Sequence, residues 1–378
     1  MKKEILEVGF VGGGINSAVG GAHFIASQMD GFFRVVAGCF STDPDVNRRT
    51  AEHHHVSDNR VYSSWEKLLA SECEHLDAVV VLTPTPAHTS VVIAALESGL
   101  AVISEKALAA SSKEVEEIKC ALEAHNGRLY VTYNYSGYPM LRELRSMITR
   151  GVLGRIEQVH IEMPQEGFAR LNRDGQPVIP QKWRLEDGSI PTISLDLGVH
   201  LHHIVHFLTR EHPQELVANQ ANLGSYHHVI DNISALVRYT NGIECNMWYS
   251  KTALGYRNGL RIRVFGDQGA AEWYQMEPEC LTMHDNYGHT SRVDRACVDV
   301  EQAQLPRYNR FKAGHPAGFL EAFANIYADI AAHLTGISLE GEHSVYSVHH
   351  ALEGLRMLES MAISAHERRW VSLEQKES

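Results

Sequence analysis

The sequence predicts an α/β fold in two parts: an amino-terminal domain on a parallel sheet, and a carboxy-terminal α+β domain with a mostly antiparallel open sheet. For the first part, a glycine run (Gly12, Gly13, Gly14) directly follows a short apolar strand, and apolar strands then alternate with amphipathic helices. For the second part, polar and apolar residues begin to alternate after residue 155. We expect domains over 1–134 and 135–378.

Composition excludes several classes of protein. A net charge of −12 argues against nucleic acid or an anionic membrane surface as the main partner. No apolar run reaches the roughly eighteen residues that span a bilayer. The opening residues, MKKEILEVGFVGGG, run into the glycines too early for a secretory signal. The six cysteines show no C-x-x-C spacing and fit reduced thiols, so we expect a cytoplasmic location.

The first strand, 7–11, and the glycines after it favour a dinucleotide site, because small residues let the backbone approach a pyrophosphate at a helix N-terminus. The G-x-G-x-x-G spacing fits Gly12, Gly14 and Gly20 only if the loop is three residues longer than usual. Candidate cofactor residues here are Gly12, Gly14, Ile15 and Asn16. The alternative is a turn without a ligand.

The second strand, 33–39, leads to the residues that distinguish NAD from NADP. Asp43 could bond the ribose hydroxyls of NAD, but it comes two or three residues late. Ser41 and Arg48, with Thr42 and Arg49, could instead hold the extra phosphate of NADP. Both cofactors stay open, with a slight preference for NAD.

Residues 79–109 predict a strand, a helix and a second parallel strand, preceded by a short helix over 62–69. Thr83 and Pro84 close the first strand, and Glu105 and Lys106 follow the second, at the edge where parallel sheets bind ligands. A helix over 111–126 leads to a strand over 128–133. Asn134 and Tyr135 stand at its end, where Tyr135 either touches substrate or closes the sheet.

The Thr-Pro-x-x-x-His segment from Thr83 to His88, followed by Glu105-Lys106, resembles the glucose-fructose oxidoreductase / inositol dehydrogenase / MocA family of NAD(P)-dependent oxidoreductases. The resemblance implies a Rossmann domain and places Lys106 beside the nicotinamide and the reacting hydroxyl. Ala107 stands where the family has proline, which removes a fixed φ. The implied cofactor residues are Thr83, Pro84, His88, Glu105, Lys106 and Asn134.

The second half predicts strands over 155–163, 216–221, 232–239, 244–249 and 260–266, and helices over 139–150, 319–334 and 345–366. The alternation indicates a sheet with one wet face. This matches the family's substrate domain, whose open sheet face commonly mediates oligomers, so we expect a homodimer or homotetramer.

The stretch 194–208 carries an apolar helical stripe that puts Asp196 and His200, four residues apart, on one face. An imidazole beside a carboxylate suits the removal of a hydroxyl proton, and the family has an Asp-x-x-x-His pair here with histidine as the base. The family's preceding glycines are absent. Lys182, Trp183 and Arg184 resemble a family segment that lines the substrate cleft, or else form a solvated basic turn.

We expect no metal ion. Adjacent histidines in the 53–55 tract point apart on a helix. His202 and His206 have helical spacing, but no third ligand lies at a known spacing.

The sequence therefore predicts hydride transfer between the nicotinamide and a secondary hydroxyl of a sugar, cyclitol or sugar derivative. Lys106, Asp196 and His200 are the catalytic candidates, and Tyr135, Lys182, Trp183, Arg184 and His200 the substrate-binding ones. An NAD-dependent glycosidase that oxidises the sugar transiently is the alternative. The coexistence of the three catalytic candidates disfavours a regulator without catalysis.

Overall fold

A computed structural model describes residues 5–341 and 343–373, so Lys2 and Lys3 of the opening stretch lie outside the described residues. The chain divides into two compact units. The first comprises Met1–Tyr138 and Gly318–Leu352, and the second Pro139–Ala317 and Glu353–Ser378. The first unit thus includes residues 318–352, which the expected boundary at 134 assigned to the second domain.

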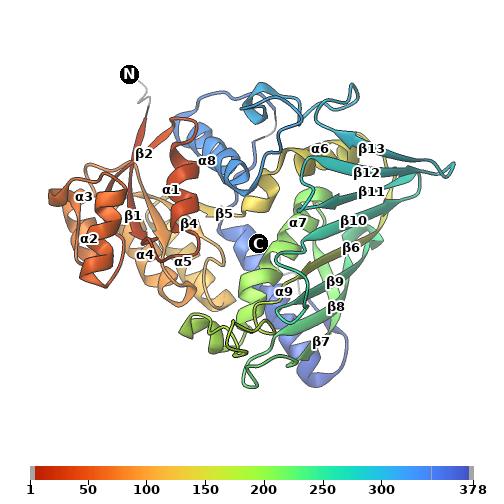
Figure 1. Cartoon of the computed structure of the whole chain (residues 1–378), viewed down its shortest axis with the longest axis horizontal. Helices are drawn as coiled ribbons and strands as arrows, with labels where there is room; N and C mark the ends of the chain where they lie inside the picture. Colours follow the sequence, from red (N-terminus) through yellow and green to blue (C-terminus); the bar gives the residue numbers. More distant parts are fainter. Residues whose placement is uncertain (1–4, 342, 374–378) are drawn as a thin grey trace. The chain divides into compact units, whose positions relative to one another are not determined.

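The first unit is built on a parallel five-stranded sheet, as the sequence predicts (Figure 1). Its strands are β1 (Leu6–Gly12), β2 (Phe33–Cys39), β3 (Ala78–Leu82), β4 (Ala101–Glu105) and β5 (Leu129–Thr132), in the order β2-β1-β3-β4-β5. Every residue of β3, β4 and β5 is buried, which explains their continuous apolar character.

Its helices are α1 (Gly20–Gln28), α2 (Pro44–His53), α3 (Trp65–Glu72), α4 (His88–Glu97), α5 (Ser112–Ala124) and α8 (Phe319–Thr335). α3 begins three residues after the predicted start at Tyr62, because the Ser64 hydroxyl accepts a hydrogen bond from the Lys67 amide and fixes the N-terminus there. α8 packs beside α1. Its apolar residues from Ala322 to Ala332 are buried, so the first unit needs this distant segment to complete its core.

The second unit contains a nine-stranded sheet in the order β13-β12-β11-β10-β6-β9-β8-β7-β14. The strands are β6 (Ile156–Pro164), β7 (Pro213–Ala221), β8 (Asn232–Tyr239), β9 (Glu244–Ser250), β10 (Arg261–Gly266), β11 (Gly269–Tyr274), β12 (Cys280–Asp285), β13 (Thr290–Asp294) and β14 (Val371–Ser372). The pair β6 and β9 is parallel and the other neighbours are antiparallel, as predicted for a mostly antiparallel sheet.

Helices cover one face of this sheet and leave the other open. The helices are α6 (Pro139–Thr149), α7 (Val199–Thr209) and, from Glu353 onward, α9 (Val348–Glu367). Met357 and Met361 of α9 accept hydrogen bonds from the hydroxyls of Tyr239 and Tyr249 on the covered face. Along β8 the residues alternate between buried and accessible, with Leu236 on the open face. The structure therefore confirms the predicted alternation of buried and accessible residues in β8.

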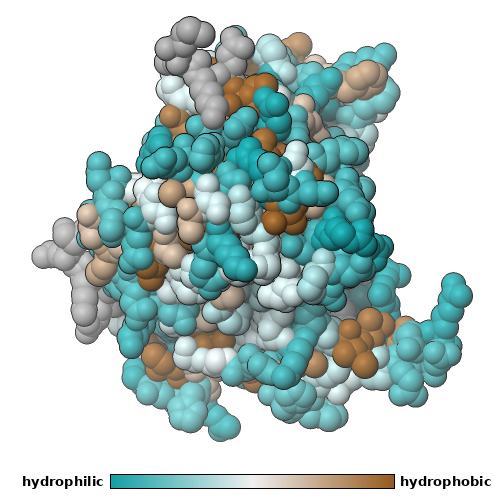
Figure 2. Space-filling view, turned by 90° about the vertical axis from the view of Figure 1, so that its left-hand side faces the viewer, coloured by the Kyte–Doolittle hydropathy of each residue, from teal (hydrophilic) through white to brown (hydrophobic). Residues whose placement is uncertain are grey.

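Among the described residues, no helix combines the length and the apolar character that a bilayer crossing requires. Figure 2 shows a mainly hydrophilic surface on the face that it presents, with hydrophobic residues in small separate groups. This surface agrees with the 21% of charged residues in the chain.

Candidate active site

The glycine loop joins β1 to α1 and needs its glycines for two reasons. Gly12 and Gly13 have φ values of +84° and +74°, which side-chain-bearing residues rarely adopt. A Cβ on Gly20 would lie 2.1 Å from the carbonyl oxygen of Gly13. The helix thus begins at Gly20, after the lengthened loop that the sequence predicts, and Ile15 and Asn16 are exposed on that loop. This close approach of strand and helix fits a bound pyrophosphate.

The candidates after β2 interact with α2. Asp43 caps this helix, because its Oδ1 accepts hydrogen bonds from the amides of Asp45 and Val46 at 2.9 and 3.1 Å. The Ser41 hydroxyl accepts the Asp43 amide at 3.1 Å. Arg48 forms ion pairs with Asp45 and Glu52 on the same helix. The residues that follow β2 therefore include an acidic helix cap, Asp43, and an arginine, Arg48, whose charge is neutralised.

His88 connects the two loops that the sequence singles out. Its Nε2 lies 2.7 Å from the carbonyl oxygen of Thr83, and its Nδ1 lies 2.9 Å from that of Ala107. The ring is buried, and burial lowers the pKa of His88 although both carbonyls favour its protonated form. The structure thus brings together the Thr83 and Lys106 loops, and the peptide between Lys106 and Ala107 is cis.

The residue before Lys106 belongs to a buried polar network. Glu105 Oε1 accepts a hydrogen bond from Thr132 at 2.6 Å and lies 3.1 Å from His23 Nε2. His23 Nδ1 lies 2.7 Å from the Tyr327 hydroxyl on α8. Burial raises the pKa of Glu105, but the contacts with His23, Lys106 and Thr132 outweigh it and lower that pKa overall. This network fixes the end of β4, where Lys106 follows.

Two buried polar atoms at the carboxyl edge of the sheet have no hydrogen-bond partner among the described residues: Thr83 Oγ1 after β3 and Asn134 Nδ2 after β5. A buried polar group without a partner costs about 1–3 kcal/mol, so such atoms indicate a place for a polar ligand. Tyr135 is buried and packs against Tyr138 and Phe319, whereas Pro84 is exposed. These atoms and the glycine loop fit a dinucleotide.

In the second unit, Asp196 lies between two cations. Its Oδ2 is 2.5 Å from Arg184 Nη1 and 2.6 Å from Lys251 Nζ, and Lys251 also donates to Gln165 at 2.9 Å. The segment Ser194–Gly198 is a π-helix rather than the α-helical turn expected from 194, since the Val199 amide bonds to the Ser194 carbonyl five residues back. The predicted pairing of Asp196 and His200 on one face thus spans the junction between this π-helix and α7, and it stays a prediction.

His200 lies in the first turn of α7, and its side chain is only 3% exposed. Of the 182–184 candidates, Arg184 forms an ion pair with Asp196, and Lys182 is exposed. The Trp183 indole donates a hydrogen bond to Gln181 at 3.1 Å, and the Arg184 guanidinium lies over its ring. Lys251 was not identified as a site residue from the sequence. Its position could have indicated one, because Lys251 is a cation that directly follows the end of β9.

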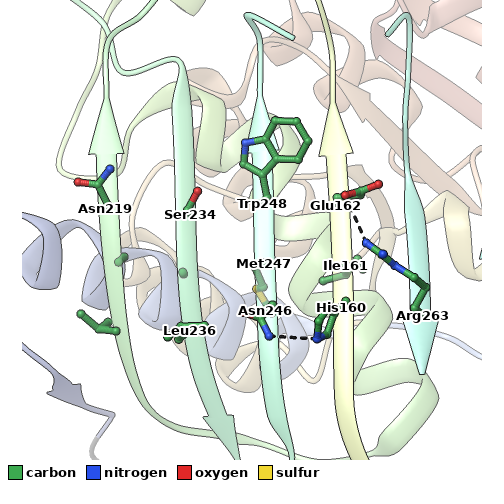
Figure 3. A pocket seen from close by; sticks show the side chains of 13 residues that line it. His160, Ile161, Glu162, Asn219, Ser234, Leu236, Asn246, Met247, Trp248 and Arg263 are labelled. Atoms are coloured by element: carbon green, nitrogen blue, oxygen red, sulfur yellow. Dashed lines mark hydrogen bonds and ion pairs between the residues drawn. The ribbon is translucent and has the colours of Figure 1, made fainter. Parts of the chain in front are cut away.

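A shallow pocket of about 470 Å³ lies on the open face of the large sheet, away from these residues (Figure 3). Its wall includes Leu236 and Trp248, with a hydrogen bond between Asn246 and His160 and an ion pair between Arg263 and Glu162. It contains none of the predicted site residues. We therefore treat this pocket as part of a surface rather than as the active site.

The histidine tract lies at the end of α2, and only His53 belongs to the helix, whereas His54 is its C-cap and His55 has a positive φ of 56°. His54 is buried and stacks on Phe24 with ring centroids 3.7 Å apart, whereas His53 and His55 are exposed. The three rings thus do not converge on one point. Burial lowers the pKa of His54 to about 4.

Comparison with known proteins places these features in a family. The model described as "Oxidoreductase family, NAD-binding Rossmann fold" matches residues 6–133. The model described as "GFO/IDH/MocA C-terminal domain" matches residues 141–272. Together they span most of both units, so the similarity covers the cofactor half and the Asp196 half alike.

Individual relatives cover nearly the full chain. The protein named uncharacterized oxidoreductase YfiI, from Bacillus subtilis, is 31% identical over 370 residues, which are 94% of each chain. Levoglucosan dehydrogenase from Pseudarthrobacter phenanthrenivorans is 24% identical over 298 residues, 70% of this chain and 72% of that one. The crystal structure of an inositol dehydrogenase homolog from Azotobacter vinelandii, complexed with NADH and myo-inositol, is 28% identical with a TM-score of 0.88 over 98% of each chain.

Proposed function

This chain belongs to the GFO/IDH/MocA family of NAD-binding oxidoreductases, and from that premise we propose that it is a dehydrogenase acting on a secondary hydroxyl of a sugar, cyclitol or sugar derivative. The observation that carries the proposal is the position of Lys106 directly after Glu105, which a buried network holds at the carboxyl end of β4 in a nucleotide-binding sheet. Relatives with the substrates levoglucosan and myo-inositol support the substrate class.

The first unit supplies the groups that would hold the cofactor. Gly12, Gly14 and Gly20 would admit the pyrophosphate to the start of α1, and Thr83 and Asn134 would supply polar contacts to the nicotinamide end. When bound, the nicotinamide supplies the hydride chemistry. We assign Glu105 to positioning Lys106, because its carboxylate is bonded to Thr132 and His23 inside the unit.

Proton transfer and charge stabilisation fall to this chain's own side chains. We assign His200 as the base that takes the hydroxyl proton, because an imidazole has a pKa near working pH. Lys106 would stabilise the negative charge that develops on the substrate oxygen. Asp196 would hold Arg184 and Lys251 ready as donors for the neighbouring hydroxyls of a polyhydroxylated substrate.

We propose NAD over NADP as the preferred cofactor. Asp43 stands at the end of β2 with only Oδ1 committed to the helix cap, which leaves Oδ2 for a ribose hydroxyl. Arg48 is already neutralised by Asp45 and Glu52, so it is a poor site for the 2′-phosphate. A kcat/KM for NAD at least tenfold above that for NADP supports this choice, and the reverse ratio contradicts it.

We also propose that the open face of the large sheet joins copies of this chain into a homodimer or homotetramer. The face combines apolar Leu236 and Trp248 with polar groups already paired to one another, as in protein interfaces. We propose a cytoplasmic location, because the six cysteines are free thiols.

The test is to incubate the purified protein with NAD or NADP and a panel of sugars and inositols, and to follow the absorbance of the reduced nicotinamide. Stoichiometric NADH and a ketone product support the dehydrogenase. Release of a free aglycone without accumulation of NADH would instead indicate the glycosidase reaction. Absence of both products across the panel, with NADH binding intact, would contradict the proposed substrate class.

A further inference from the structure

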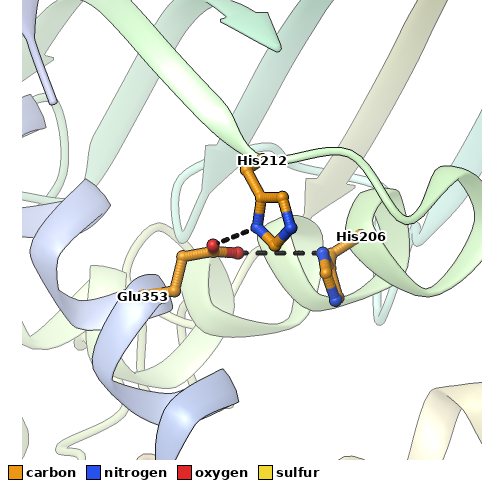
Figure 4. Close-up of side chains that lie close together, drawn as sticks. All are labelled: His206, His212 and Glu353. Carbon is orange, nitrogen blue, oxygen red and sulfur yellow. Dashed lines mark hydrogen bonds and ion pairs between the residues drawn. The ribbon is translucent and has the colours of Figure 1, made fainter. Parts of the chain in front are cut away.

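Two histidines and one carboxylate converge in the second unit, outside every residue assigned above. We call His206, His212 and Glu353 the His-Glu cluster (Figure 4). Each can offer one donor atom, and these atoms all lie within 4.8 Å of one another. From the sequence, His206 is considered only with His202 and no metal ion is expected, because the carboxylate, Glu353, stands about 140 residues beyond the two histidines.

A tight reversal of the chain brings the two rings together. α7 ends at Thr209, and Arg210 adopts a left-handed conformation with φ of 61° while its amide bonds to the His206 carbonyl at 2.7 Å. The next residues therefore turn back, and the His212 ring lies 5.0 Å from the His206 ring. Glu353 of α9 reaches both, with Oε2 2.5 Å from His212 Nδ1 and Oε1 3.7 Å from His206 Nδ1.

A second layer of groups holds the cluster in place. His202, one turn before His206, has Nε2 3.1 Å from Glu353 Oε1 and Nδ1 3.2 Å from the hydroxyl of Tyr239. The carbonyl of Glu211 lies 3.1 Å from His206 Nδ1. Outer partners of this kind orient the ligands in metal sites, where imidazoles and carboxylates are themselves hydrogen-bonded.

We propose that His206, His212 and Glu353 bind one divalent transition metal ion of the zinc class. Two imidazoles and a carboxylate suit zinc, cobalt or nickel, whereas magnesium and calcium prefer oxygen ligands alone. A tetrahedral zinc with bonds of about 2.0–2.1 Å needs donor atoms roughly 3.3 Å apart, and the donor atoms here all lie within 4.8 Å of one another. The His212 side chain is 47% exposed, so an ion can enter from solvent.

The three proposed ligands come from segments that are far apart in the sequence, with Glu353 141 residues beyond His212. The ion would link three segments: the end of α7, the residues just before β7, and α9. Its role would be to stabilise the second unit.

The test is titration of the chelator-treated full-length protein with zinc ions, by calorimetry and by metal analysis after dialysis. We expect one zinc per chain and a higher Tm. His212→Ala and Glu353→Gln should each weaken binding at least tenfold. The matched control is His289→Ala, since His289 forms an exposed ion pair with Asp285 at 2.8 Å outside the cluster and should bind zinc as the unaltered protein does.

Cobalt titration adds a spectroscopic readout, because tetrahedral cobalt absorbs far more strongly than the octahedral aquo ion. Zinc binding below one equivalent per chain, or the same loss in His289→Ala as in His212→Ala, would overturn the proposal. His212 is half exposed, so its variant should fold. The Tm without metal checks this directly, and an unchanged value makes any lost binding specific.

Discussion

His23 and Glu105 face each other inside the first unit, with Nε2 of the imidazole 3.1 Å from Oε1 of the carboxylate. The histidine comes from α1, which follows the glycine loop, and the glutamate ends β4 immediately before Lys106. This contact therefore links the proposed pyrophosphate site to the proposed catalytic lysine. Tyr327 of α8 bonds to the other nitrogen of the same ring, so three distant segments fix one position.

Replacing Lys106 with methionine should reduce turnover by about 100-fold or more, because the developing alkoxide loses its cation. NADH binding, followed by fluorescence titration, should change little. Lys119→Met is the control, since Lys119 lies on α5 beside Glu123, outside the proposed site. Unchanged turnover in Lys106→Met would remove the role that we assign to it.

Replacing His200 with asparagine should lower kcat by about 100- to 10,000-fold, the usual contribution of a general base. The profile of kcat/KM against pH should also lose the limb that reports the base. His203→Asn, a buried neighbour on α7, separates catalysis from packing. Equal losses in both variants, with an unaltered pH profile in each, would assign His200 to structure alone.

Gly20→Ala should weaken NADH binding or lower the Tm, because the new Cβ would overlap the Gly13 carbonyl oxygen at 2.1 Å. Overpacking of this kind costs about 1–3 kcal/mol. Gly21→Ala is a matched control, since its Cβ meets no atom within 4 Å. Titration with NADH and thermal unfolding should show an effect at Gly20 and little change at Gly21. Equal behaviour would argue against the close contact.

His54 should make stability depend on pH. Its folded pKa of about 4 lies below the ordinary histidine pKa of 6.5, so the unfolded chain binds the proton first. The stability from the neutral ring is complete above about pH 6.5 and is lost as pH falls towards 4, by about 1–3 kcal/mol. Denaturant unfolding of His54→Phe should show a flatter profile over this range. His53→Gln, at the exposed neighbour, should retain the slope. An unchanged slope in His54→Phe would refute the assignment.

Leu236→Arg should shift the protein towards the monomer in light scattering, because it places a charge on the open face of β8. Val298→Arg alters an equally apolar side chain on a loop, where Val298 is almost fully exposed, and should leave the mass unchanged. If the Leu236 variant keeps the mass of the unaltered protein, the open sheet face is not the interface.

Most of the fold could be predicted from short stretches of the sequence. The glycine run, the β-branched runs of β3 and β4 and the Ser111 cap of α5 are each readable within a few residues, and the structure has these elements there. The lengthened loop before Gly20 was also predictable, because the resemblance to the family implies a histidine three residues after the last glycine, and His23 stands there. Strands β11, β12 and β13 were not predicted. In β12 and β13 most side chains are accessible, so the alternation of polar and apolar residues carries little information.

The site was less predictable, because its contacts join residues that are far apart in the sequence. Lys251 reaches Asp196 across 55 residues, and Glu105 and Tyr327 share His23 across more than 200. The periodicity of apolar residues identifies the buried face of a helix, but it does not identify the residues that pack against that face. The π-helical turn at Ser194 shows the same limit, since a Cβ on its last residue, Gly198, would lie 3.0 Å from the hydroxyl of Tyr249, which is distant in the sequence.

The return of α8 to the first unit has a consequence for biosynthesis. A ribosome releases residues 1–138 long before 318–352, yet the polar network behind Lys106 needs Tyr327. The nucleotide-binding half must wait, incomplete, until about nine-tenths of the polypeptide has been translated. Nascent chains stalled before residue 318 should consequently remain open to protease in their first 138 residues.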